Sequence, residues 1–351
     1  MTADERRRPA LEPGAIAEVL EDAYGISSVA FGADTSGHDA VTRAWRVTTA
    51  AEAFSVKARP ADARLDLAGR AARYLRDAGL TEVVAPVPAL DGSLSVRAGE
   101  ASIAVFPFVD GRRGMEVGLG DAQWERLGRF ARDLHGITLP VDFDEQIPRE
   151  SFRIREVEAF ERVDRAVASS PDAAPEARHV VETWRRHRDV IAEVVERTAA
   201  LGAEAEALGR PHVICHADLH TGNVLVGAAG ELWVIDWDEV VAAPRERDLM
   251  FVIGGISREL VSDDATASFL RGYGGTIIDP VVLSYYRHAW ATQDVVGYAE
   301  QVLLEPSRSE EDRAEAARIL ETLFRPGEIV DIARSSITSP GAGSPRPRRR
   351  T

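Results

Sequence analysis

The stretch that decides the fold is HVICHADLHTGNVLVGAAGELWVIDWD, residues 212–238. Two short apolar runs lie in its second half, VLV at 224–226 and LWVI at 232–235. Between them the segment AAG at 228–230 provides a turn, and together these features are the pattern of a β-hairpin. The sequence therefore predicts a small β-structure directly after the histidine-rich segment.

The predicted hairpin brings two oxygen-bearing side chains together at its open end. With the turn centred between positions 229 and 230, Val224 pairs with Ile235, and Asn223 lies opposite Asp236. Directly opposed residues on antiparallel strands have Cα atoms about 4.5–5.5 Å apart. An amide oxygen and a carboxylate at that spacing can bind the same Mg²⁺ ion, which prefers oxygen ligands. Asp218, in the loop before the hairpin, is placed to accept a proton from a hydroxyl.

The motif HADLHTGN at 216–223, followed by IDWD at 235–238, resembles the aminoglycoside phosphotransferase family. The resemblance covers nearly the whole chain and implies an α+β, bilobal protein-kinase-like fold, with a small β-rich N-lobe and a larger, mainly helical C-lobe. The implied division is an N-terminal β-rich nucleotide-binding lobe at 1–110 and a helical lobe with the catalytic loop and acceptor site at 111–334. The Ser-, Pro-, Gly- and Arg-rich composition of 335–351 predicts a disordered tail.

The same resemblance assigns roles to individual residues. It implies that Asp218 is the catalytic base, that Asn223 and Asp236 hold Mg²⁺, and that Lys57 contacts the phosphates of ATP or GTP. The other implied nucleotide contacts are a turn over the phosphates and a hinge along the adenine edge: Ser36, Gly37, Phe106, Pro107, Phe108 and Val109.

Lys57 stands out in the composition, because it is the only lysine among the 42 Lys and Arg residues. It ends the predicted strand Ala53–Ala58, where a compact ammonium suits a tight phosphate site better than a guanidinium fork. Kinases of this fold usually pair such a lysine with a glutamate on the next helix, yet residues 65–78 contain only Asp66 and Asp77 as acids. Asp66 could serve, the phosphates alone could hold the lysine, or the helix could pack differently.

The composition narrows the class of partner. The net charge of −15 argues against a nucleic-acid binder, which needs a basic face, and suits a cationic small molecule. The single cysteine, Cys215, excludes an intrachain disulfide, and no run of eighteen apolar residues predicts a membrane span. We therefore expect a cytoplasmic protein, a monomer or weak dimer, that binds neither nucleic acid nor membrane.

The acceptor is predicted less directly. Asp238 and Glu239 follow the predicted metal ligand and are expected to point towards the acceptor. Trp290 and Asp294, four residues apart on one helix face, could form a wall for a protonated amino sugar, although core packing is the alternative. The segments VVAPVP at 83–88 and VFPFVDG at 105–111 look most like the spectinomycin phosphotransferase branch. The resemblance thus implies O-phosphorylation of an aminocyclitol antibiotic, conferring resistance; a metabolic kinase for an amino alcohol, amino acid or sugar is the alternative.

Two other classes of function compete with a kinase. His216, Asp218 and His220 alternate as in a metal cluster of a hydrolase, but the sequence lacks a second histidine cluster, and His216 is expected to brace the loop backbone. The missing helix glutamate suggests a non-catalytic kinase-like binding protein, but Asp218, Asn223 and Asp236 are all present.

Overall fold

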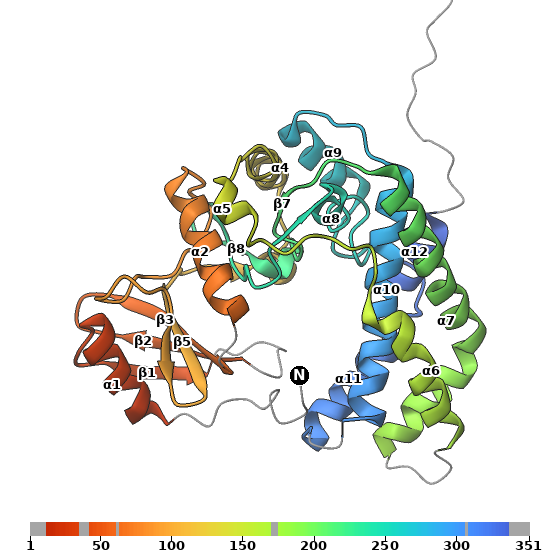
Figure 1. The fold of residues 1–351 in the computed structure, drawn as a ribbon, viewed down its shortest axis with the longest axis horizontal. Helices are drawn as coiled ribbons and strands as arrows, with labels where there is room; N and C mark the ends of the chain where they lie inside the picture. The colour runs from red at the N-terminus through yellow and green to blue at the C-terminus, as the bar shows by residue number, and fades with distance from the viewer. Residues whose placement is uncertain (1–11, 35–41, 61–62, 170–174, 306–307, 337–351) are drawn as a thin grey trace, which may run out of the picture. The chain divides into compact units, whose positions relative to one another are not determined.

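The computed structural model describes residues 12–34, 42–60, 63–169, 175–305 and 308–336 (Figure 1). The chain divides into two compact units, which are described separately below. The first comprises residues 1–149, 213–242 and 267–275, and the second residues 150–212, 243–266 and 276–351. These boundaries differ from the predicted division after residue 110, so the two predicted lobes stay a prediction.

A five-stranded antiparallel sheet forms the N-terminal part of the first unit. Its strands lie in the order β1-β2-β3-β5-β4, and every neighbouring pair is antiparallel. Their bounds are β1 (Ala30–Asp34), β2 (Arg43–Thr48), β3 (Ala53–Pro60), β4 (Val96–Ala98) and β5 (Ala101–Pro107).

Helix α1 (Pro13–Tyr24) packs its apolar side against one face of this sheet (Figure 1). Ile16 and Leu20 are fully buried there against Val56 and other residues of the central strands. Side chains alternate between the two faces of a strand, so Lys57 on β3 points to the opposite face from Val56. The core on the α1 side therefore fixes which side chains of β3 are left to form a site.

The rest of the first unit carries the segment that decides the fold. Strands β6 (Arg112–Arg113), β8 (Val224–Val226) and β9 (Leu232–Val234) form a three-stranded sheet, and β7 (Val213–Cys215) pairs with β10 (Val241–Ala243). The accompanying helices are α2 (Ala63–Asp77), α3 (Gly114–Val117), α4 (Asp121–His135), α5 (Val141–Asp144) and the short 3₁₀ turn η2 (Thr221–Asn223).

The second unit is helical. Its helices are α6 (Arg155–Ala168), α7 (Pro175–Leu208), α8 (Glu246–Leu249), α10 (Pro280–Leu303), α11 (Glu310–Thr322) and α12 (Ile329–Ser335), while α9 (Asp263–Tyr273) spans the boundary between the units. Helix α10 packs against α6, α7, α11 and α12. Asp279 caps its N-terminus by accepting hydrogen bonds from the N–H groups of Val281 and Val282, which fixes where the helix begins.

This mixture of an antiparallel sheet with separate helices confirms the predicted α+β class. The apolar periodicity of the sequence also predicts a helix capped by Asp121 and running to His135, a helix over Asp263–Tyr273 and a strand at 83–87. Both helices form, α4 with Gly120 rather than Asp121 as its cap, whereas the strand is reduced to a single bridge between Val83 and Val234. Ser335 ends α12, and the remaining predicted tail from 337 onwards lies outside the described residues.

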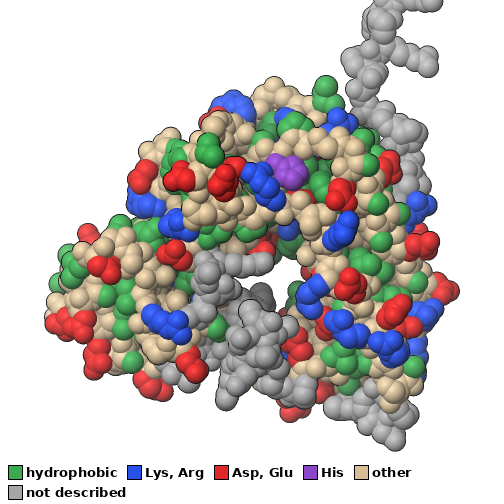
Figure 2. Space-filling view, in the orientation of Figure 1, with side chains coloured by type: hydrophobic (Ala, Val, Ile, Leu, Met, Phe, Trp, Pro, Cys, Tyr) green, Lys and Arg blue, Asp and Glu red, His purple; other side chains and the backbone are tan. Residues whose placement is uncertain are grey.

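Two further observations concern the described part of the chain as a whole. None of its helices is both long and apolar enough to cross a membrane. On the face shown in Figure 2, acidic and basic side chains are interspersed rather than gathered into one basic field, as expected for a net charge of −15.

Candidate active site

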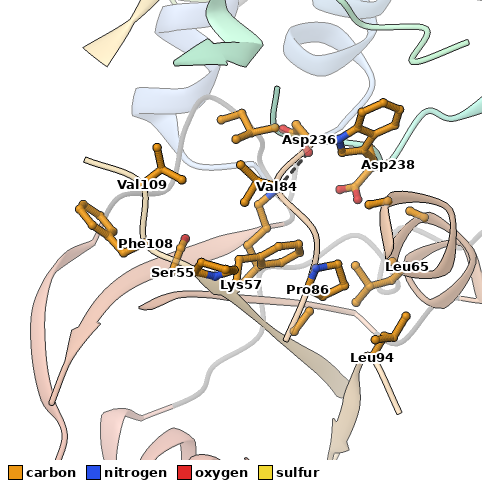
Figure 3. Close-up of a pocket in the computed structure, with 18 of the residues that line it drawn as sticks. Ser55, Lys57, Leu65, Val84, Pro86, Leu94, Phe108, Val109, Asp236 and Asp238 are labelled. Atoms are coloured by element: carbon orange, nitrogen blue, oxygen red, sulfur yellow. Dashed lines mark hydrogen bonds and ion pairs between the residues drawn. The ribbon is translucent and has the colours of Figure 1, made fainter. Parts of the chain in front are cut away.

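Lys57 and Asp236 form an ion pair at the centre of a pocket in the first unit. Lys57 Nζ donates to Asp236 Oδ1 over 2.9 Å (Figure 3). The ammonium also lies 5.8 Å from the ring centroid of Phe106. The structure thus brings together the predicted phosphate-binding lysine and one of the two predicted metal ligands.

The charges of this pair stabilise each other. The ammonium of Lys57, more than the burial that opposes it, lowers the pKa of Asp236 to about 2. Burial alone would lower the pKa of Lys57, but the charges of Asp236 and Asp238 outweigh it and raise that pKa. At neutral pH the pocket therefore presents one cation and an ionised carboxylate.

Asp218 and Asn223 are joined directly in the loop before β8. The side-chain amide of Asn223 donates both to the main-chain oxygen of Asp218, over 2.9 Å, and to Asp218 Oδ2, over 2.7 Å. The other oxygen, Oδ1, is buried without a hydrogen-bond partner and lies 3.5 Å from Nε2 of His220. Burial alone would raise the pKa of Asp218, but its interactions with His220 and His216 outweigh burial and lower it. Asp218 is thus an ionised carboxylate with a spare acceptor oxygen.

His216 braces this loop, as the sequence predicts. Its side chain is fully buried. Nδ1 accepts the main-chain N–H of Asp218 at 3.2 Å, and Nε2 donates to the main-chain oxygen of Ile235 at 2.9 Å. Both ring nitrogens are therefore occupied by main-chain groups, so His216 has no lone pair left for a metal ion. This geometry removes the alternative of a hydrolase cluster.

Gly222 permits the tight turn that follows. His220 Nδ1 accepts the N–H of Gly222 at 3.0 Å, and a Cβ at position 222 would lie 2.6 Å from the His220 ring. Arg113 donates to the main-chain oxygen of Gly222 from the neighbouring strand β6. The loop before β8 is thus fixed both by hydrogen bonds of its own side chains and by Arg113 of strand β6.

The predicted register of the hairpin is wrong by one residue. Val224 pairs with Val234 instead of Ile235. The reason is the turn: Gly227 bonds to Glu231, which leaves a three-residue loop, and Gly230 adopts a φ of +84° within it. Ile235 N–H then donates to the main-chain oxygen of Asn223 at 3.0 Å.

Asp236 therefore lies one residue beyond the position opposite Asn223. It has a left-handed φ of +70°, a conformation that aspartate tolerates better than most residues. The chain turns at this point, and the carboxylate reaches Lys57. Asn223 and Asp236 thus both lie at the open end of the hairpin, but they are not directly opposed residues.

The donors here fit a magnesium ion. The orientation of Asn223, with its amide nitrogen directed to Asp218, leaves its oxygen for another partner. Asp236 supplies a carboxylate, of which Oδ1 is bonded to Lys57. An amide oxygen and a carboxylate are the kind of oxygen ligands that Mg²⁺ accepts together with water.

The pocket around Lys57 has a volume of about 130 Å³ and is lined on one side by the predicted hinge, Phe106 to Val109. Figure 3 shows Phe108 and Val109 on one side of Lys57, and Leu65 and Leu94 on the other. Phe108 N–H is taken by the main-chain oxygen of Ala53, over 3.0 Å, and Pro107 has none. The other two predicted nucleotide contacts, Ser36 and Gly37, lie outside the described residues.

Helix α2 contributes no carboxylate to the pocket. It lines the pocket only with Leu65, Ala68, Gly69 and Ala72, whose spacing places them on one helix face. Its two acids are paired elsewhere on the helix, Asp66 with Arg70 and Asp77 with Arg73. Asp66 therefore does not replace the missing glutamate.

A second ion pair, which the sequence analysis missed, lies beside the first. Arg59 Nη1 donates to Asp238 Oδ2 at 2.7 Å, and Asp238 lines the same pocket as Lys57. The alternation of β3, which puts Arg59 on the Lys57 face, was the available signal. Glu239 is exposed in the following turn. The structure thus commits the charge of Asp238 to Arg59, and its predicted contact with an acceptor stays a prediction.

The other two predicted acceptor residues belong to α10 of the second unit. Trp290 is partly buried, with its ring 4.9 Å from that of Phe251 and perpendicular to it. The guanidinium of Arg247 lies 5.7 Å from the Trp290 ring. Asp294 is also partly buried on this helix. One cation of the protein itself thus already lies near the indole that was expected to face a cationic substrate.

Comparison with known proteins places this geometry in context. A model of the phosphotransferase enzyme family matches residues 36–286. Protein StrN of Streptomyces griseus is 29% identical over 182 residues, which are 50% of this chain and 55% of that protein. The chain thus matches about half the length of this curated relative.

Solved structures agree over a longer span. The crystal structure of spectinomycin phosphotransferase in complex with ADP and spectinomycin has a TM-score of 0.83 and 24% identity, covering 94% of this chain and all of that one. The AMP-bound complex of the same enzyme gives 0.80 and 25%, covering 93% and 99%. A microcompartment-associated aminopropanol kinase gives 0.58 and 16%, covering 93% and 98%.

Proposed function

Because the chain belongs to the phosphotransferase enzyme family, it is a kinase whose acceptor is an alcohol, and we propose that this alcohol is a hydroxyl of an aminocyclitol antibiotic related to spectinomycin. The phosphoryl donor is ATP or GTP with Mg²⁺. Phosphorylation of the drug would confer resistance on the cell that makes this protein.

The choice of acceptor rests on the difference in TM-score between two solved structures that resemble this chain. Agreement with spectinomycin phosphotransferase extends over 94% of this chain at a TM-score of 0.83, whereas the aminopropanol kinase, covered almost as fully, reaches 0.58. The fold is common to all of these kinases, so the closer match supports an acceptor of similar size and shape.

The residues of the first unit have distinct tasks in this proposal. Asp218 uses Oδ1 to orient the acceptor hydroxyl and takes its proton, while Asn223 holds Asp218 in place through one hydrogen bond to its carboxylate and one to its main-chain oxygen. Lys57 contacts the phosphates of the nucleotide. Asn223 and Asp236 would hold Mg²⁺, which when bound supplies positive charge against the phosphates of the donor.

The adenine lies in the part of the pocket beside the hinge. Of the hinge N–H groups, Val109 has no hydrogen-bond partner among the described residues and is the donor for an adenine nitrogen. The apolar side chains of Leu225 and Ile235 line the same pocket and would pack against the base. Trp290, Asp294, Asp238 and Glu239 remain our proposed acceptor contacts.

The experiment is a panel of acceptors presented to the purified protein with ATP and Mg²⁺. It includes spectinomycin, several 2-deoxystreptamine aminoglycosides, ethanolamine and 1-amino-2-propanol, with release of ADP measured and each product checked by mass for one added HPO₃ group. We expect turnover with spectinomycin and, in a sensitive host expressing the gene, resistance to that drug. Turnover confined to the amino alcohols would refute the antibiotic assignment and establish a metabolic kinase.

A further inference from the structure

Strand β3 directs two cations to the same face. Lys57 and Arg59 are separated by Ala58, which is fully buried in the core on the opposite face. Two acids, Asp236 and Asp238, have the same spacing in the segment that follows β9. Lys57 Nζ lies 2.9 Å from Asp236 Oδ1, an ion pair that we call the first rung. Arg59 Nη1 lies 2.7 Å from Asp238 Oδ2, which we call the second rung.

The second rung is the better shielded of the two. The exposed fractions of the side chains are 16% for Arg59 and 23% for Asp238, against 21% and 41% for Lys57 and Asp236. A shielded ion pair is screened less by salt and water than a surface pair, and removing one partner leaves an uncompensated charge. Arg59 with Asp238 is therefore a firm link between β3 and the segment 236–238.

The Lys57–Asp236 pair is expected to weaken when a divalent cation binds. Asp236 is bonded to Lys57 here, and it is also the carboxylate placed to bind the divalent cation. A carboxylate that coordinates a dication shares its charge and its lone pairs with that ion, so its hold on Lys57 weakens. Helix α2 offers Lys57 no replacement, because its pocket face consists of Leu65, Ala68, Gly69 and Ala72.

Asp238 is the remaining anion near this lysine. After Asp236 it is the next negative charge that acts on the Lys57 ammonium. Arg59 Nη1 holds its Oδ2, and this is the ion pair that Arg59 makes among the described residues.

We propose that Arg59 is a positioning residue for nucleotide binding: through Asp238 it keeps β3 and the segment 236–238 in register, so that Lys57 stays aimed at the phosphates when Asp236 turns to the metal. In this chain the ion pair takes over the task that a glutamate on α2 would perform. The inference rests on the proposed function, since it presupposes that the pocket binds a nucleotide with Mg²⁺.

The test is calorimetric binding of ADP, with and without Mg²⁺, to wild-type protein and to Arg59→Gln, Arg59→Lys and Asp238→Asn. We expect Arg59→Gln and Asp238→Asn to raise the Kd of ADP about tenfold with Mg²⁺, within the range usual for the coupling between residues in contact, and clearly less without it. Arg59→Lys keeps the charge and should recover part of the loss. The double variant Arg59→Gln/Asp238→Asn should be no worse than either single variant, because both remove the same link.

A matched control separates positioning from general stability. Arg126 and Glu82 form another ion pair of the first unit, 3.0 Å long and outside the pocket lining. Arg126→Gln should lower the melting temperature about as much as Arg59→Gln while leaving the Kd of ADP unchanged. If Arg59→Gln binds Mg²⁺ and ADP as tightly as Arg126→Gln does, or if the two losses add in the double variant, the inference is wrong while the proposed function stands. Wild-type protein that binds no ADP at all would overturn both.

Discussion

Lys57 and Asp236 are 179 residues apart in the chain, yet their charged atoms lie 2.9 Å from each other. This contact joins β3, the third strand of the N-terminal sheet, to the segment that follows β9 of the hairpin. It therefore places the predicted phosphate-binding cation beside the predicted metal ligand within one compact unit. The predictions below start from this centre and move outwards.

Replacing the proposed base tests the chemistry at the centre. Asp218→Asn keeps the shape of the side chain and an acceptor for Asn223 but removes the charge that takes the proton. We expect kcat to fall about 10²–10⁴-fold, the usual contribution of a general base, with the Kd of ADP nearly unchanged. Asp133→Asn, on α4, is the control and should leave kcat unaffected. A near-normal kcat in Asp218→Asn would remove this residue as the base.

Replacing the predicted metal ligand tests a different property. Asp236→Ala removes one oxygen donor and frees Lys57, so Mn²⁺, used in place of Mg²⁺ because it can be followed by electron paramagnetic resonance, should no longer bind with ADP. Asn223→Ala should weaken the same binding, because the amide oxygen is the second donor. Undiminished Mn²⁺ binding in both variants would show that the ion is held elsewhere.

His216, which braces the loop before β8, is expected to contribute to the free energy of unfolding. His216→Ala leaves the Asp218 N–H and the Ile235 oxygen without their partner in a fully buried place. Each buried group left unpaired costs about 1–3 kcal/mol, so we expect a clear drop in the free energy of unfolding in a urea titration. The activity of the variant should also fall, since the Asp218 main chain is no longer fixed. An unchanged urea midpoint would contradict the bracing role.

One buried histidine of the second unit predicts a pH dependence. His288 is almost fully buried on α10, and its Nδ1 lies 2.8 Å from the main-chain oxygen of Ser284. Burial is the main cause that lowers its pKa below the ordinary value of 6.5. As the pH falls, this histidine therefore takes up a proton in the unfolded chain at a higher pH than in the folded protein. Its contribution to the free energy of unfolding is fully present above about pH 6.5 and is lost as the pH drops towards the pKa of the folded state.

His288→Asn keeps a donor for Ser284 and removes the titration. We expect its melting temperature to fall less than that of the wild type between pH 7.5 and pH 5. Gln293→Asn, a substitution without a titratable group at a partly buried position of α10, is the control and should keep the wild-type slope. Parallel slopes for wild type and His288→Asn would mean that another group causes the loss.

Local patterns predicted much of the fold because their causes are local. The helix Asp263–Tyr273 has the bounds that its periodicity indicates, and α4 ends at His135 as predicted. The sequence also places Asp218 and Asn223 in one loop, and the structure joins them by hydrogen bonds. Such features depend on residues within a few positions of each other.

The errors come from features that local pattern does not determine. Whether the hairpin turn has three or four loop residues depends on the positive φ of Gly230, and this one-residue difference moved the partner of Val224. The left-handed bend at Asp236 turns the chain so that its carboxylate reaches Lys57, and the predicted metal site shared with Asn223 stays a prediction. A turn type is chosen by the whole hairpin, so the letters AAG alone could not settle it.

The link between Arg59 and Asp238 was missed for a different reason. It joins residues 179 positions apart, and the sequence analysis examined Lys57 without its neighbour on the same strand face. The motif IDWD drew attention to Asp238 as an acceptor contact, whereas the structure pairs it within the pocket. Periodicity on β3 could have suggested Arg59, but only the folded chain shows which acid it meets.

The solitary lysine makes the pocket chemically addressable. A chain with one ε-amino group can be modified by an acylating reagent at just that side chain and at its N-terminal amine, so a digest would report on Lys57 without any engineered label. Its protonated, paired state should make the acylation slow. A bound nucleotide would shield Lys57 and slow its acylation further. The rate of acylation at this single lysine would therefore report whether the pocket holds a nucleotide.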